Sequence, residues 1–181
     1  MSSTTTAVPL RERTRLEIKQ HALELFAERG YEATSLADIA VAVGCSKATV
    51  LYHFENKAAI LAEVLAPAAD HLGVVLTELL TYPADTVQDR AIDAFIDVVV
   101  RFRGLAVMFG GSDLLFETPA FSSVADLCRL LPQLLAGGDD DERMSATFFA
   151  LNGAVAECRD PSRDDDSLRA VLQMCMRRLL T

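Results

Sequence analysis

The chain has 181 residues, of which 51% are apolar and 24% are charged, and its formal net charge is −9. This length can bury a core in one or two domains, and no run approaches the roughly 18 uncharged apolar residues of a membrane span. The four cysteines and three histidines lack metal-ligand or disulfide spacing, and no nucleophile–base pair stands out. We therefore expect no metal, no cofactor and no enzymatic activity.

Residues 1–10 begin with a serine- and threonine-rich stretch that has no apolar signal core. We expect a disordered lead-in there and a cytoplasmic protein. Residues 11–30 predict one long helix, because Ile18, Ala22, Leu25 and Phe26 recur on one face and Gly30 can end it.

Residues 35–54 predict two short helices joined by a turn. Ser35 can cap the first helix, with Asp38 three residues later as in a capping box. Gly44 can end that helix in the left-handed conformation, and Ser46 can cap the second. This pattern is typical of a helix-turn-helix, although a surface helical hairpin packed on a neighbour has the same signature.

The second helix of this motif has one face suited to DNA. Val50 and Phe54 are four residues apart and predict the buried side, while Ala48, Thr49 and Tyr52 lie opposite. A small residue lets the backbone approach a groove, and hydroxyls can donate to phosphates or base edges. Lys47 at the helix start, and Lys57 at the start of the following helix, suit phosphate contacts.

Many positions of residues 14–61 fit one known pattern in a single register. They are Thr14, Arg15, Ile18, the run 25–31, Thr34, Ser35, Ile39, Ala40, Val43, Gly44, Ser46, Lys47, Thr49, His53, Phe54, Lys57 and Leu61. This stretch, about the first third of the chain, resembles the N-terminal domain of TetR-type transcriptional regulators. The resemblance implies an all-α protein with an N-terminal DNA-binding domain and a C-terminal helical domain for ligand binding and dimerisation.

Three positions depart from the family pattern. Leu51 stands where members usually carry a phosphate-contacting tyrosine, and the tyrosine of this chain comes one position later, at Tyr52. Ala48 often corresponds to glycine, and Cys45 to valine. We expect the DNA contacts to come from Arg15, Thr34, Ser35, Ser46, Lys47, Ala48, Thr49, Tyr52, His53 and Lys57.

The acidity of the chain is confined to its C-terminal part. Residues 1–62 hold 7 basic and 7 acidic side chains, whereas residues 63–181 hold 10 and 19. All three lysines lie in the first part, and Arg11, Arg13 and Arg15 cluster there. Because salt screens charges beyond about 10 Å at 0.1 M, local attraction to phosphate remains possible. The arginine cluster can alternatively be a solvated helix start.

The domain prediction follows from these features. We expect a lead-in at 1–10, a helix-turn-helix DNA-binding domain at 11–57 with its motif at 35–54, and a ligand-binding and dimerisation domain at 58–181. A helix from about 56 to 82 joins the two domains, and Pro67 either kinks it or starts a new helix.

Residues 86–116 offer candidates for an effector site. Phe95 and Phe102 belong to an apolar stripe that also includes Ala91 and Val98. Arg103 projects from an apolar side of the predicted helix, so its charge needs a partner. Its guanidinium either pairs with a ligand anion or reaches solvent at the end of the helix. Asp113 among aromatic residues either holds a cationic ligand or faces solvent. The predicted pocket residues are Phe95, Phe102, Phe109, Asp113, Phe116, Phe148, Phe149 and Asn152.

Two acidic breaks, at 137–142 and 164–166, precede the last two predicted helices. The first of these helices has no charge from Met144 to Ala156, so it must be covered on every side. A partner subunit is the natural cover, and two such helices from each copy can form a four-helix bundle. The predicted dimer interface comprises Phe149, Val155, Leu168, Leu172, Cys175 and Leu179.

The sequence therefore predicts a homodimeric, ligand-responsive regulator that binds double-stranded DNA, with the function of a repressor. A small molecule would release it from a near-palindromic operator whose half-sites lie about 34–36 Å, or a multiple, apart. The alternative is a helical protein-interaction module that has lost DNA binding, which Leu51 and the net acidity favour.

Overall fold

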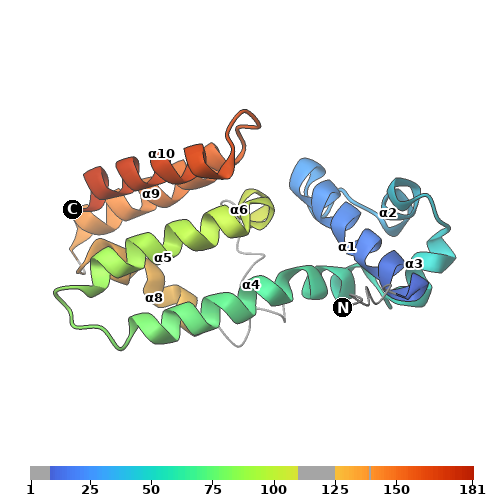
Figure 1. The fold of residues 1–181 in the computed structure, drawn as a ribbon, viewed down its shortest axis with the longest axis horizontal. Helices are drawn as coiled ribbons and strands as arrows, with labels where there is room; N and C mark the ends of the chain where they lie inside the picture. Colours follow the sequence, from blue (N-terminus) through green and yellow to red (C-terminus); the bar gives the residue numbers. More distant parts are fainter. Residues whose placement is uncertain (1–8, 110–124, 139) are drawn as a thin grey trace, which may run out of the picture. The chain divides into compact units, whose positions relative to one another are not determined.

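The computed structural model describes residues 9–109, 125–138 and 140–181, so the expected disordered lead-in lies almost wholly outside it. Within these ranges the protein is helical and contains no strand, which confirms the all-α prediction (Figure 1). The chain divides into two compact units, Met1–Val64 and Leu65–Thr181.

Unit 1 contains α1 (Leu10–Arg29), α2 (Leu36–Val43), α3 (Lys47–His53) and the first turns of α4 (Lys57–Leu79). α2 packs on α1 and α3 packs on α2. The core of the unit is built from fully or almost fully buried apolar side chains on all four helices: Ile18, Ala22, Leu25, Phe26, Ile39, Ala40, Val50, Phe54, Ile60 and Leu61. The buried faces predicted for residues 11–30 and 35–54 are confirmed by this core.

The helix ends of unit 1 are fixed as the sequence predicts. The Oγ of Ser35 accepts the backbone N–H of Asp38 at 3.2 Å, while the Asp38 carboxylate accepts the backbone N–H of Ser35 at 2.9 Å. Two donors that α2 cannot satisfy internally are thereby paired. Gly44 ends α2 with φ of 75°, a left-handed conformation in which a side chain would be strained.

Helix α4 continues through Pro67, so this proline does not start a new helix. Proline has no N–H, and the i→i−4 hydrogen bond that residue 67 would make to the carbonyl of Glu63 is therefore missing. α4 is long and apolar enough to span a membrane by length and composition alone. Its side chains Ile60, Leu61, Leu76 and Leu79 are buried, but only 33% of the most apolar 18-residue window of this helix is buried within the protein.

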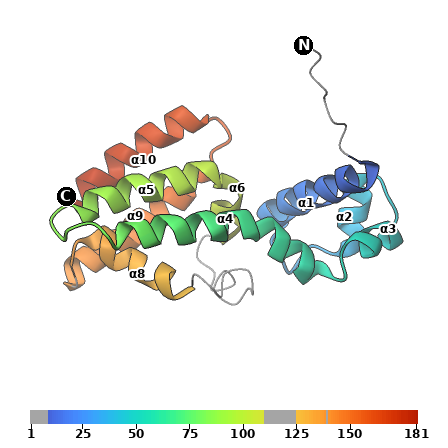
Figure 2. The ribbon, with the colours of Figure 1, turned by 60° about the horizontal axis from the view of Figure 1, so that its bottom comes forward.

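Unit 2 combines the rest of α4 with α5 (Val87–Arg101), α6 (Arg103–Phe109), α8 (Ala125–Ala136), α9 (Asp141–Cys158) and α10 (Asp165–Leu180). α10 packs on α9 and α5, α8 packs on α5 and α9, and α6 packs on α9 (Figures 1 and 2). The buried residues of α5 and α10 that fill this bundle are Ala91, Ile92, Ile96, Val99, Val100, Leu168, Leu172, Met176 and Leu180.

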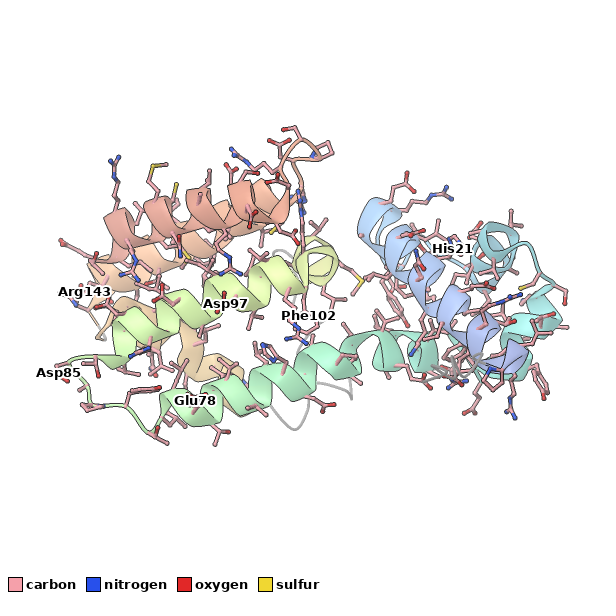
Figure 3. The ribbon with its side chains drawn as sticks, viewed as in Figure 1. His21, Glu78, Asp85, Asp97, Phe102 and Arg143 are labelled. Atoms are coloured by element: carbon pink, nitrogen blue, oxygen red, sulfur yellow. The ribbon has the colours of Figure 1, made fainter. Side chains whose placement is uncertain are left out.

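The stripe predicted on α5 is buried only in part, because Ala91 is its one fully buried residue. Phe95 and Val98 are only half-buried, while Ile92 and Ile96 are fully buried. The acidic face of α5 is also not simply solvated. Its carboxylates pair with arginines of α10: Arg169 with Asp97, and Arg177 with Asp89 at 3.1 Å and Asp93 at 2.7 Å (Asp97 is labelled in Figure 3).

Arg103 is a structural residue of unit 2. Its Nε donates to the carbonyl of Cys158 at 2.7 Å and its Nη1 to that of Arg163 at 2.6 Å, and Nη2 donates to the carbonyl of Asp160. The guanidinium thus satisfies carbonyls at the end of α9 and in the loop that leads to α10. This arrangement differs from both expectations for Arg103, which were that it binds a ligand anion or that it reaches solvent at a helix end.

Candidate nucleic-acid interface

Helix α3 is held at its start and along one side, which leaves its other side open. The Oγ of Ser46 accepts the backbone N–H of Thr49 at 3.0 Å and also lies 2.9 Å from the Thr49 hydroxyl. Val50 is completely buried beneath the helix, and Phe54 just after it is buried too. Four side chains of α3 are exposed: Lys47, Ala48, Leu51 and Tyr52. We call these four residues the exposed face of α3.

Two cations accompany this exposed face. Lys47 is the first residue of α3, and the guanidinium of Arg11, in the first turn of α1, lies 5.4 Å from the ring centroid of Tyr52. Among the described residues, neither cation has an acidic side chain within ion-pair distance. Both charges are therefore available to an anion outside the protein.

Arg15 is placed differently from Arg11. Its Nε donates to the Glu63 carboxylate at 3.2 Å, its Nη2 donates to the other oxygen of Glu63, and its Nη1 donates to the backbone carbonyl of His53. The guanidinium also lies 4.1 Å from the ring centroid of Phe54. Three of its five N–H donors are therefore used inside unit 1, which does not favour the expected DNA contact by Arg15, and that contact stays a prediction.

Thr34 is also a structural residue. It is 2% exposed, and its hydroxyl donates to the carbonyl of Gly30 at 2.9 Å and lies 3.3 Å from that of Leu25. Burial withdraws its side chain from DNA, so the predicted contact of Thr34 stays a prediction that concerns its backbone alone. The hydroxyl instead fixes the segment that connects α1 with α2.

Lys57 connects the same segment with α4. Its ammonium donates to the carbonyls of Tyr31 at 2.6 Å and Thr34 at 2.9 Å, and it lies 4.1 Å from the Tyr31 ring centroid. Next to it, the side chain of Asn56 accepts the backbone N–H of Ala59 at 2.8 Å. The predicted charge of Lys57 is therefore largely used inside unit 1, whereas the N–H groups of the first turn of α4 remain a potential phosphate site.

The remaining predicted DNA residues divide by their exposure. Ser35 and Ser46 are exposed but cap α2 and α3. His53 is half-buried at the end of α3, and its ring meets that of Tyr52 edge-on at 5.2 Å. Sequence reasoning missed two residues: Arg11 as a residue next to Tyr52, and Leu51 as part of the exposed face. By their spacing, Arg11 and Arg15 both lie near the face of Ile18, so the sequence pattern alone does not show which arginine turns inward.

In unit 2 the predicted effector pocket is only partly testable. Phe109, Asp113 and Phe116 lie outside the residues whose side chains the structure describes. Phe95 is half-buried, and the ring of Phe102 lies 5.7 Å from that of His71 on α4 (Phe102 is labelled in Figure 3). Phe102 therefore contacts α4, and its place in an effector pocket stays a prediction.

Three predicted pocket residues are not in the interior. Phe148 and Phe149 are 67% and 71% exposed, and Asn152 is exposed with its amide donating to the carbonyl of Phe148 at 2.8 Å. They cannot line an internal pocket of their own subunit, and this prediction is corrected. The described surface has a shallow, widely open groove of about 570 Å³ whose lining residues all lie on α4: Ala69, Asp70, Gly73, Val74, Thr77, Glu78 and Thr81.

The predicted dimer residues also separate into two groups. Leu168 and Leu172 are 0% and 1% exposed, because they pack within unit 2, so they are not available to a partner. Leu179 is 51% exposed, Cys175 is exposed and Val155 is half-buried. Exposed, uncharged positions recur along α9 at helical spacing: Ser145, Phe148, Phe149, Asn152, Gly153 and Ala156. We call these six positions the α9 face.

Comparison with protein families places the helix-turn-helix region in one of them. Residues 18–64 match the model for bacterial regulatory proteins of the tetR family. The chain is 25% identical over 134 residues, 72% of each protein, to the biofilm operon icaADBC HTH-type negative transcriptional regulator IcaR of Staphylococcus aureus. It is 42% identical over 93 residues to the HTH-type transcriptional regulator Mb3439c of Mycobacterium bovis, which covers 50% of this chain and 47% of that protein.

Solved structures share the fold along nearly the whole chain. The ketosteroid transcriptional regulator KstR2 of Mycobacterium tuberculosis superposes with a TM-score of 0.71 and 20% identity, covering 96% of this chain and 95% of that one. A TetR-family transcriptional regulator from Bordetella parapertussis gives a TM-score of 0.69 with 22% identity, covering 93% and 95%. At these identities the likeness concerns the fold of both units.

Proposed function

This chain belongs to the TetR family of bacterial transcriptional regulators, and we propose that it represses transcription by binding an operator through α3 of unit 1. The observation that carries the proposal is the exposed face of α3. A short capped helix presents Lys47, Ala48, Leu51 and Tyr52 outward and is accompanied by the free cation of Arg11. A helix of this kind fits the major groove, with its N-terminal residues at the base edges.

The local charges support one mode of docking. Lys47 and Arg11 lie beside the exposed face, while the surplus of acidic residues belongs to unit 2. Phosphate attraction therefore acts on unit 1, and the acidic remainder disfavours other orientations on DNA. The backbone N–H groups at the start of α4 can add a phosphate contact, because a helix N-terminus attracts anions.

The proposal includes a homodimer in which the α9 face meets that of a second copy. The exposed rings of Phe148 and Phe149, whose centroids lie 6.5 Å apart, form an apolar surface that water would otherwise contact. A two-fold dimer presents two copies of α3, so the operator would be near-palindromic, with half-sites about 34–36 Å or a multiple of this apart.

Release by a small molecule and a cytoplasmic location complete the proposal. Regulation would require an effector that binds unit 2 and favours the DNA-free state. Shifting an equilibrium from 1:99 to 99:1 needs about 5.5 kcal/mol of differential binding. The groove along α4 and the ring pair Phe102–His71 are the described features of unit 2 that suit such an effector.

A salt titration tests DNA binding directly. The full-length protein is used to enrich duplexes from a random pool, and the affinity for the enriched duplex is measured from low to moderate salt. Each phosphate contact contributes about 0.9 to the log–log slope. We expect a near-palindromic sequence to be enriched, and we expect a log–log salt slope that corresponds to several phosphate contacts. A protein that enriches no sequence and shows a flat salt response would instead be a protein-interaction module.

A further inference from the structure

We infer that Arg15 is a positioning residue: with Glu63 it fixes the C-terminal end of α3, and it does not contact DNA. This inference rests on the proposed DNA binding by α3 and assigns a role to two residues within it. The relevant contacts join three helices of unit 1, because Arg15 lies on α1, the carbonyl of His53 ends α3, and Glu63 lies on α4.

Helix α3 needs support at both ends. It has seven residues, and helices this short are not stable in water by themselves. The Oγ of Ser46 satisfies an amide at its N-terminus. At the other end, the carbonyl of His53 accepts from Arg15, and a cation at this end also suits the partial negative charge of the helix terminus.

The guanidinium is itself held in place on two further sides. Its fork makes two hydrogen bonds to the carboxylate of Glu63, and its plane lies near the ring of Phe54, the residue that follows α3. A lysine cannot reproduce this geometry, because an ammonium lacks the planar fork. The position of the His53 carbonyl relative to α1 and α4 therefore depends on an arginine at residue 15 and on a carboxylate at residue 63.

Arg15 is paired with a carboxylate where it lies. The side chains of Arg15 and Glu63 are 28% and 38% exposed, and Lys19 adds a second cation 3.9 Å from the same carboxylate. A guanidinium already paired with a carboxylate releases few counterions when DNA binds. Phosphate contact and positioning thus predict different salt dependence for the same substitution.

The decisive experiment compares Arg15→Lys, Arg15→Ala and Glu63→Gln with wild type on two duplexes of equal length. One duplex carries the sequence enriched by the wild-type protein, and the other carries a scrambled sequence. We expect each variant to bind the enriched duplex on the order of tenfold more weakly, as after loss of one charge-assisted hydrogen bond. In Arg15→Lys, which keeps the charge, binding to the scrambled duplex and the salt slope should remain those of wild type. Arg15→Ala with Glu63→Gln should be no weaker than Arg15→Ala alone.

Arg29→Ala is the matched control. Arg29 is a cation of the same helix, is 55% exposed and pairs with the adjacent Glu28 at 3.6 Å, so its loss removes the same charge without touching α3. A slope reduced by about 0.9, with equal weakening on both duplexes, would make Arg15 a phosphate contact and overturn the inference. Unchanged affinity in Arg15→Lys and Glu63→Gln would overturn it as well.

Amide hydrogen exchange without DNA separates this inference from the proposed function. Faster exchange across residues 47–53 in Arg15→Lys and Glu63→Gln, with wild-type exchange in Arg29→Ala, supports the positioning role even for a protein that enriches no duplex. Wild-type exchange across α3 in both variants would contradict the role, whatever the DNA measurements give.

Discussion

The guanidinium of Arg11 lies 5.4 Å from the ring centroid of Tyr52, which joins the first turn of α1 to the exposed face of α3. One turn later on α1, Arg15 is engaged by Glu63 and the carbonyl of His53. The two arginines of this cluster therefore have different roles: Arg11 is available to an external anion, whereas Arg15 stabilises the protein itself.

Arg11→Ala and Lys47→Ala should each remove a phosphate contact. We expect the log–log salt slope to fall by about 0.9 in each variant, with affinity reduced to a similar extent on specific and scrambled duplexes. Fluorescence anisotropy at four or more salt concentrations measures both quantities. Arg29→Ala should retain the wild-type slope, and a wild-type slope in both Arg11→Ala and Lys47→Ala would exclude these residues from the DNA contact.

Leu51 should contact a thymine methyl group. It is an apolar side chain, 44% exposed, between Ala48 and Tyr52 on the exposed face, and the methyl is the apolar feature of the major groove. Replacing the contacted thymine by uracil should weaken wild-type binding about fourfold, since one buried methyl is worth about 0.8 kcal/mol.

The Leu51 contact is tested by scanning each thymine of the enriched duplex with uracil. In Leu51→Ala, the same base replacement should have little further effect, because the methyl has already lost its partner. Wild-type binding that tolerates uracil at every position would refute the contact. Leu10→Ala, which also shortens an exposed leucine of unit 1, should leave the uracil effect unchanged.

Ser35→Ala should destabilise unit 1 by about 1 kcal/mol, the usual cost of losing an N-cap. The side-chain hydrogen bond from Ser35 lowers the pKa of Asp38, and the backbone N–H of Ser35 lowers it further. Because the pKa of Asp38 is lower in the folded protein, the hydrogen bonds that its carboxylate makes with Ser35 stabilise the fold fully above the ordinary aspartate pKa of about 4. This stabilisation is lost as the pH falls through the pKa that Asp38 has in the folded protein. Thermal unfolding at pH 7 and near pH 3 should therefore show a smaller difference between Ser35→Ala and wild type at the acid pH.

Much of unit 1 could be predicted because its signals are local. Ser35, Asp38, Gly44 and Ser46 specify caps and a turn within a few residues of sequence, and each adopts the predicted geometry. The contacts of Arg15 could not be predicted in the same way, because Glu63 is 48 residues away in sequence. Spacing alone identifies a cationic helix face but not which cation has a carboxylate opposite it.

Unit 2 shows how a predicted site changes when the buried face of a helix is assigned one or two residues away from its true position. On α10 the buried side chains are Leu168, Leu172, Met176 and Leu180, whereas the sequence also allowed a stripe through Cys175 and Leu179. Both stripes are apolar, so composition does not decide between them. In the structure Arg177 pairs with Asp89 and Asp93 on α5, while Cys175 and Leu179 are exposed.

Arg103→Ala should lower the stability of unit 2 by about 2–4 kcal/mol. Three backbone carbonyls lose a charged donor at once, and each such hydrogen bond contributes about 1.5–3 kcal/mol when considered singly. Arg103→Lys should be less destabilising, because an ammonium can still reach some of the carbonyls. Thermal unfolding measures both; an arginine that served only to hold a ligand would leave the melting temperature unchanged in either variant.

Phe149→Glu should convert the protein to a monomer. Phe149 is 71% exposed and lies in the uncharged α9 face, where a carboxylate pair across a two-fold axis would be desolvated and repulsive. Sedimentation velocity should show the monomer mass, and affinity for a duplex with two half-sites should fall to that for a single half-site. Val74→Glu is the matched control, since Val74 is 67% exposed on α4, and it should leave the dimer intact. A Phe149→Glu protein that still sediments as a dimer would show that copies of this chain associate through another surface.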